Sequence, residues 1–158
     1  MSRIFTKAEA DYLVAAPKFI WVIPRHQFLD RTRKTGWLIQ SLVFDAANPK
    51  EPIKGLVVKA RLHQAPIGLP RLSPSAALEW YAKRIRGINY ELRHDNPDGT
   101  FIRGWHEHVW CPDEQDQRVI AARPEPRRKD LLGLLKWGLK KWNIEVRREQ
   151  ASLDGIDD

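Results

Sequence analysis

The chain has 158 residues, of which 42% are hydrophobic, and a formal net charge of +7. This composition excludes a generally disordered chain, and no apolar run approaches the ~20 residues that a bilayer span requires. We expect a single domain over residues 1–150 and a flexible acidic tail over 151–158, in a cytoplasmic protein whose lone cysteine, Cys111, cannot form an internal disulfide.

The N-terminal half of the chain has the pattern of one short helix followed by strands. The capping-box sequence Thr6-Lys7-Ala8-Glu9 predicts a helix that ends before Pro17. The apolar segments after it predict strands over 19–23, 37–44 and 56–62, with a basic loop over 24–35 and a turn over 48–52.

The C-terminal half begins with a proline-rich loop over 66–74. Ser73-Pro74 has the form of a helix start, and a short helix should follow because apolar residues recur at helical spacing, namely Leu78, Tyr81, Ala82 and Ile85. Alternating residues then predict a β-hairpin over 87–110 around a turn at 95–99, an edge strand over 118–122 and an amphipathic helix over 129–142.

Together these elements predict an α+β fold. We expect a mostly antiparallel β-sheet flanked by an N-terminal and a C-terminal helix, with one short helix in the middle of the chain.

Two histidines separated by one residue, His106 and His108, are the most distinctive feature of the predicted hairpin. Residues two apart in a strand point to the same side, so the two imidazoles should stand about 6–7 Å apart along the strand. The large apolar residues Phe101, Trp105 and Val109 are expected to face the core. Both histidines should therefore lie on the opposite, solvated face.

Polar residues of the first hairpin strand should share that face, namely Asn89, Glu91 and Arg93. Such a set suits RNA cleavage, because one imidazole can remove the 2′-hydroxyl proton, the other can protonate the leaving 5′-oxygen, and an arginine can stabilise the transition state. This mechanism needs no metal and no other cofactor. We assign catalysis to His106, His108, Arg93 and Glu91, and the shaping of the site to His94, Asp95 and Asn96.

Two other interpretations of the same residues stay open. Polar side chains on the solvated face of a half-buried sheet are ordinary, and the histidines there can simply pair with their neighbours. Alternatively, a His-x-His pair on a strand supplies two nitrogen ligands to a metal ion, which would make the protein a metal-binding enzyme.

Positive charge is concentrated in the loop over 24–35 and around the last predicted helix. Clustered basic residues can hold phosphates without reading sequence, so we expect RNA or another nucleic acid as a partner. The expected contacts come from Arg128, Lys129, Lys136, Lys140 and Lys141. A non-catalytic module that uses this surface to bind nucleic acid or a protein, such as a phage-derived inhibitor, is the alternative to an enzyme.

The hairpin and the last helix resemble the TumE-type toxins and related small bacterial and archaeal domains of unknown function. The matching residues are Tyr90, Arg93, Asp95-Asn96, Phe101, His106-Glu107-His108 and the helix from Lys129, with Thr6–Asp11 and the turn Asn96-Pro97-Asp98-Gly99 as further matches. The resemblance covers about a third of the chain and does not include residues 24–85. It implies a toxin of a two-gene toxin–antitoxin or defence system, a helix-turn-helix antitoxin as partner, and damage to RNA as the activity.

Overall fold

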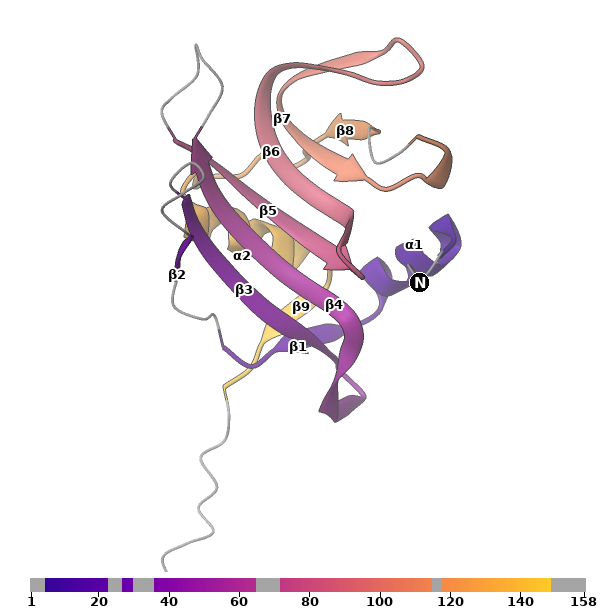
Figure 1. Cartoon of the computed structure of the whole chain (residues 1–158), viewed down its shortest axis with the longest axis vertical. Helices are drawn as coiled ribbons and strands as arrows, with labels where there is room; N and C mark the ends of the chain where they lie inside the picture. The colour runs from indigo at the N-terminus through magenta and orange to yellow at the C-terminus, as the bar shows by residue number, and fades with distance from the viewer. Residues whose placement is uncertain (1–4, 23–26, 30–35, 65–71, 115–117, 149–158) are drawn as a thin grey trace, which may run out of the picture.

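The computed structural model describes residues 5–22, 27–29, 36–64, 72–114 and 118–148 (Figure 1). These residues form two α-helices, one short 3-10 helix and nine strands. The helices are α1 (Lys7–Ala15) and α2 (Leu131–Lys141), and the 3-10 helix is η1 (Pro112–Glu114). The strands are β1 (Lys18–Ile20), β2 (Gln27–Leu29), β3 (Gly36–Asp45), β4 (Asn48–Gln64), β5 (Leu72–Trp80), β6 (Lys83–Asp95), β7 (Phe101–Val109), β8 (Val119–Ala121) and β9 (Ile144–Val146).

All nine strands join one mixed sheet. Its strand order is β8-β7-β6-β5-β4-β3-β1-β9, and β2 pairs with β3 outside this path. Neighbouring strands are antiparallel except β1 and β9, which are parallel. Figure 1 shows a strongly twisted sheet in which β6 and β7 form a long curved hairpin, while α2 lies behind the central strands.

The main core lies between α2 and one face of the sheet. A row of directly paired residues crosses that face from β4 to β7, formed by Ala60, Ala76, Ile88 and Glu107. All four are buried, and α2 covers the face with the buried residues Leu134, Leu135, Leu139 and, at its C-cap, Trp142. The apolar stripe predicted for this helix is thus confirmed.

The predicted α+β class is wrong. Strands dominate the described residues, the sheet contains a parallel pair, and α1 and α2 are the only α-helices found there. The helix predicted after Ser73 is instead β5, a tight turn and the start of β6. The prediction failed because Leu78 and Ile85 lie on adjacent strands, and the two-residue turn Tyr81-Ala82 between them brings apolar residues to a helix-like spacing by coincidence.

This turn carries no sequence signal that favours it. Both of its residues have positive φ, 49° for Tyr81 and 64° for Ala82. Such a conformation matches the twist of a hairpin, but it normally selects Asn or Gly. The alternation along β5, where Ala76, Leu78 and Trp80 are buried, overrides that local preference.

Most of the other predicted elements are confirmed within a few residues. The capping box of Thr6 and Glu9 starts α1, the 87–110 hairpin is β6 and β7, and the edge strand is β8. The turn predicted over 48–52 is wrong, since the chain turns at Ala46-Ala47 and β4 begins directly after it. The basic loop over 24–35 contains β2; its remaining residues, most of the 66–74 loop and the 151–158 tail lie outside the described residues. Sequence reasoning missed β9.

Within the described ranges, neither helix has the length and apolar character needed to cross a membrane.

Candidate metal centre

The β6–β7 hairpin places two histidines on the face of the sheet that is turned away from α2. Trp142, at the C-cap of α2, donates from Nε1 to Oε1 of Glu107 at 3.3 Å, so Glu107 faces that helix. Because strand residues alternate between faces, His106 and His108 point to the other side. The predicted shared face of the two imidazoles is confirmed, and their ring centroids are 5.2 Å apart.

The prediction that this face is solvated is wrong at these positions. His106 has 0% of its surface exposed and His108 has 3%. Trp105 is buried as expected, but Phe101 is half-exposed and Val109 is only partly buried. Strand β7 is therefore covered on both faces around the histidines, which periodicity alone cannot reveal.

A register irregularity in the hairpin decides which residue of β6 joins the histidines. Glu91 pairs with Gly104 and His94 with Ile102, so two residues of β6 lie opposite one of β7. Gly104 has a φ of +84°, a conformation that glycine tolerates and that is common at bulges. The irregularity brings His94 next to the other two histidines.

The three imidazoles form a nearly regular triangle. His94 lies 5.1 Å from His106 and 5.4 Å from His108, measured between ring centroids. With Glu91 they offer four ligand atoms that all lie within 4.8 Å of one another. Tetrahedral ligands at bond lengths of about 2.0–2.1 Å lie about 3.4 Å apart, so small side-chain rotations would bring the three imidazoles onto one ion.

Hydrogen bonds fix which nitrogen of each buried ring faces the cluster. Nδ1 of His106 donates to the Gly104 carbonyl at 2.9 Å, which leaves Nε2 as the lone-pair nitrogen. That Nε2 is buried and has no hydrogen-bond partner among the described residues. Nε2 of His108 lies 2.9 Å from Oδ1 of Asn89 and donates to it, so Nδ1 carries the lone pair.

Asn89 and Glu91 complete the supporting contacts. Nδ2 of Asn89 donates to Oε1 of Glu91 at 3.3 Å, and Oε2 of Glu91 lies 2.9 Å from Nδ1 of His94. Oε1 of Glu91 is 4.0 Å from Nε2 of His106. Asn89 thus orients both His108 and Glu91, as residues behind metal ligands commonly do.

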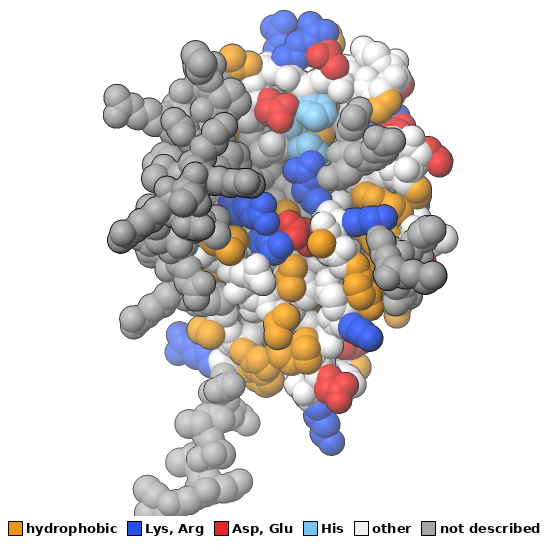
Figure 2. Space-filling model, viewed as in Figure 1, with side chains coloured by type: hydrophobic (Ala, Val, Ile, Leu, Met, Phe, Trp, Pro, Cys, Tyr) orange, Lys and Arg blue, Asp and Glu red, His pale blue; other side chains and the backbone are white. Residues whose placement is uncertain are grey.

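The cluster is buried at one end and accessible at the other. The side chain of His106 is 0% exposed, while those of His94 and Glu91 are 16% and 35% exposed. Burial lowers the pKa of the His106 imidazole, and the Gly104 carbonyl and the Glu91 carboxylate oppose this only in part. A neutral imidazole is the form that binds a metal. Figure 2 shows the face opposite α2, where histidine side chains reach the surface between an acidic and several basic side chains.

Three residues predicted for the site do not join the cluster, namely Arg93, Asp95 and Asn96. Arg93 is exposed, forms an ion pair with Asp95 at 2.7 Å between Nη2 and Oδ1, and stacks its guanidinium over the Phe101 ring. Asp95 is likewise exposed and turned toward Arg93. The irregularity between Glu91 and His94 is the reason, because it ends the simple alternation that would have placed Arg93 beside Glu91.

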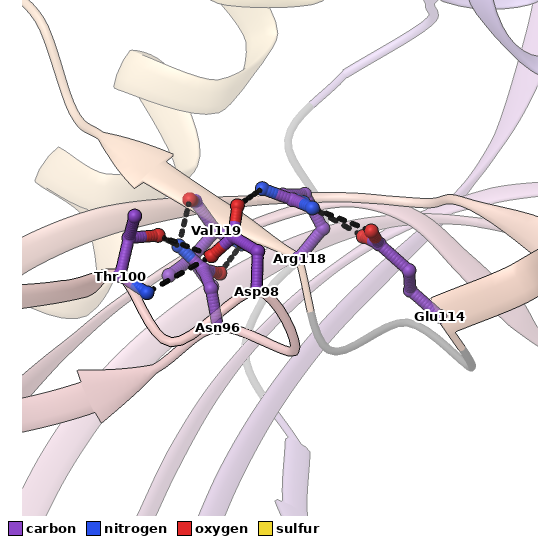
Figure 3. A network of polar contacts seen from close by, with 6 residues as sticks. All are labelled: Asn96, Asp98, Thr100, Glu114, Arg118 and Val119. Carbon is purple, nitrogen blue, oxygen red and sulfur yellow. Dashed lines mark hydrogen bonds and ion pairs between the residues drawn. The ribbon is translucent and has the colours of Figure 1, made fainter.

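Asn96, predicted to shape the site, instead joins the hairpin turn to β8 (Figure 3). Its Oδ1 accepts from the Val119 amide at 2.8 Å, and its Nδ2 donates to the Val119 carbonyl at 3.2 Å and to Oγ1 of Thr100 at 3.1 Å. Since Val119 pairs with His108 and Ala121 with His106, Asn96 acts on the histidines through β8.

Arg118 reinforces the same connection. Its guanidinium bonds to Oδ2 of Asp98 at 2.7 Å and, through Nε, to Oε2 of Glu114 at 2.7 Å (Figure 3). Hydrogen bonds from Thr100 and Arg118 hold the pKa of Asp98 well below its usual range. The turn, η1 and β8 are therefore held as one unit at the end of the hairpin.

The basic residues predicted to bind nucleic acid lie on the α2 side of the sheet. All are exposed: Arg128, Lys129, Lys136, Lys140 and Lys141. Arg128 is paired with Asp130 at 2.6 Å, and Lys141 donates to the Arg123 carbonyl at 3.0 Å. Lys136 and Lys140 line an open depression of about 370 Å³ between α2 and β9. The sheet separates this surface from the histidines.

Sequence reasoning missed three charged residues on the histidine face of the sheet, namely Lys59, Glu79 and Arg84. It also gave His94 a lesser role than its neighbours. Gly104 is the signal that could have shown the importance of His94, because a glycine inside a strand pattern often marks a bulge, and a bulge changes which neighbouring residues face the histidines.

No protein-family model, curated protein or solved structure matches this chain. The resemblance to the TumE-type toxins therefore stays a prediction.

Proposed function

We propose that the chain is a metal-dependent enzyme that holds one divalent transition-metal ion with His94, His106 and His108, beside the carboxylate of Glu91. The observation that carries the proposal is the buried Nε2 of His106, which faces two further imidazoles and a carboxylate and has no hydrogen-bond partner in the described chain. A buried polar atom without a partner costs free energy, and a metal bond would remove that cost.

The donor set indicates the kind of metal. Imidazole nitrogens with one carboxylate suit Zn²⁺ and other first-row transition ions, whereas Ca²⁺ and Mg²⁺ prefer all-oxygen ligands. We therefore expect Zn²⁺ to bind far more tightly than Mg²⁺. Asn89 and the Gly104 carbonyl would orient His108 and His106, as their present hydrogen bonds do.

The exposure gradient supports a catalytic role over a purely structural one. Glu91 and His94 are the accessible members, so a substrate can approach from their side. A bound metal ion supplies a Lewis acid and an activated water near neutral pH. Three imidazoles would leave the fourth position of a tetrahedral ion to water, and Glu91 is the carboxylate placed to exchange a proton there, which suits hydrolysis.

Metal analysis and titration test this proposal. Purified protein should bind about one equivalent of Zn²⁺, and His106→Ala and His108→Ala should each abolish stoichiometric binding while far-ultraviolet circular dichroism keeps its strand signature. Arg93→Gln is the matched control, because Arg93 is turned toward Asp95, and it should bind as the original protein does. Equal Zn²⁺ binding by the His106→Ala variant would refute the metal centre.

A metal-free ribonuclease of the toxin–antitoxin type is our second proposal. The convergence of His106, His108 and Glu91 on one face favours it, since these groups could exchange the protons of RNA cleavage. Two features weigh against it: burial lowers the pKa of His106, which disfavours a protonated acid, and Arg93 lies outside the cluster. RNA cleavage that survives chelation but is lost in His106→Ala would favour this second proposal.

The predicted partners and location belong to that second proposal. Binding of RNA by Lys136, Lys140 and their neighbours, a helix-turn-helix antitoxin and a cytoplasmic location would all follow from a toxin-like protein. Co-expression with the product of the adjacent gene, followed by co-purification, tests the antitoxin.

A further inference from the structure

A second group of charged residues lies on the same face of the sheet as the histidines. A row of directly paired residues crosses the four strands from β4 to β7, and its members are, in this order, Lys59, Ala77, Gly87 and His108. Directly paired residues point to the same side of a sheet, so Lys59 lies on the histidine face. Arg61, two residues along β4, shares that face.

Small residues separate the lysine from the histidine. Ala77 and Gly87 lie between Lys59 and His108, and the Arg84 side chain crosses this stretch. A Cβ placed on Gly87 would meet Cδ of Arg84 at 2.7 Å, so the arginine stem rests directly on the glycine. Only glycine leaves room for this path. Because Gly87 is paired with His108, this path places the Arg84 stem beside the strand that carries the histidines.

The group carries more positive than negative charge. Within the described part of the chain, Glu79 is the carboxylate that contacts two of these cations: it forms an ion pair with Lys59 and approaches Nη2 of Arg61 at 3.6 Å. The side chains of Lys59 and Glu79 are only 16% and 12% exposed, whereas Arg61 is 47% exposed. Lys59 and Arg61 thus share one carboxylate, and the positive charge that remains is one that a bound anion would balance. Figure 2 shows basic side chains next to the histidines on this face.

Resting on the proposed metal-dependent function, we infer that Lys59, Arg61 and Arg84 bind a phosphate group of the substrate while the cluster acts on another part of it. Arginine binds phosphate through paired N–H groups, and an adjacent lysine adds charge. From β4 to β7 the sheet spans three strand spacings, about 14 Å, which matches the length of a nucleotide-sized molecule.

Phosphate binding and metal binding can be measured separately on the same variants. Zn²⁺-loaded protein is titrated with inorganic phosphate, a nucleoside 5′-monophosphate and a short single-stranded RNA, and metal content is determined in parallel. Arg61→Gln and Arg84→Met should each weaken binding of the monophosphate about tenfold and keep one bound Zn²⁺. Lys50→Gln is the charge-matched control on β4, about 30 Å from Lys59 along the strand, and should bind the monophosphate as the original protein does.

The outcomes separate this inference from the metal proposal. Unchanged monophosphate binding in both arginine variants, or its absence in the original protein, would overturn the phosphate site even if Zn²⁺ binds. If the original protein does not bind Zn²⁺, that result would instead count against the metal centre. RNA binding that falls in the same two variants would assign the phosphate to a nucleic-acid chain, whereas binding of the monophosphate alone would assign it to a small substrate.

Discussion

The carboxamide oxygen of Asn89 lies 2.9 Å from Nε2 of His108, across the β6–β7 pair. The same carboxamide donates to Glu91 at 3.3 Å. One neutral side chain therefore sets the orientation of two members of the cluster. Its position follows from the register, since Asn89 is paired with His106 and shares the face of both histidines.

Replacing Asn89 should weaken metal binding. Asn89→Ala removes the acceptor for His108 and the donor for Glu91, and losses of this kind typically lower metal affinity about 10- to 100-fold. Asn89→Asp keeps an acceptor for His108 and should weaken binding less. Competition with a chromogenic chelator at neutral pH measures both affinities. An Asn89→Ala variant with the original affinity would contradict the role we give this residue.

Gly138 of α2 offers a test of packing against helix propensity. In an ordinary helix interior, glycine to alanine stabilises by about 1 kcal/mol. Here a Cβ would lie 2.5 Å from Cζ3 of the buried Trp142 ring, so Gly138→Ala should destabilise the protein by about 1–3 kcal/mol.

Urea denaturation measures the free energy of unfolding of this variant. A Trp142→Leu background is the control, because it removes the ring that the new methyl group would strike. In that background Gly138→Ala should lower the free energy of unfolding much less. An equal loss in both backgrounds would rule out this clash as the cause.

Asn96 should contribute to stability and, through β8, to the metal site. Asn96→Ala removes both hydrogen bonds to Val119 and the one to Thr100, and we expect a loss of about 2 kcal/mol in the free energy of unfolding. Amide hydrogen exchange at Val119 should accelerate strongly. Asn96→Asp keeps the acceptor for the Val119 amide, so its free energy of unfolding should lie between those of the original protein and Asn96→Ala. Slow exchange at Val119 in the alanine variant would show that β8 is held by other contacts.

Lys18 gives a pH dependence with a defined sign. Its side chain is 1% exposed, Nζ donates to the Val14 carbonyl at 3.0 Å, and burial lowers its pKa from 10.5 to about 8. Between pH 8 and 10.5 the unfolded chain binds more protons at this group than the folded protein does. The Lys18 contribution to the free energy of unfolding should therefore rise with pH across this interval, by about 3 kcal/mol in total.

Other lysines and tyrosines titrate in the same interval, so the comparison is made with Lys18→Met. The difference in the free energy of unfolding between the two proteins should change with pH in the direction stated, as measured by urea denaturation at a series of pH values. A constant difference would mean that the folded protein keeps the pKa of Lys18 near its usual value.

Local sequence features correctly predicted α1, α2 and the hairpin. The capping box of Thr6 and Glu9, the leucine stripe of α2 and the alternation around His106 depend on interactions within a few residues, so they can be read without the fold. The prediction of a middle helix was wrong because Tyr81 and Ala82 adopt positive φ only where the paired strands on both sides require a tight turn.

By itself the sequence determined that His106 and His108 share one side of a strand, because alternation is a property of any extended backbone. Only the tertiary structure decided that His94 joins them and Arg93 does not. One extra residue of β6 between Glu91 and His94 changes which side chains face the cluster, and no local pattern specifies the register between two strands. The burial of His106 and His108 is likewise tertiary, because it depends on the side chains that the hairpin brings together on their face of the sheet.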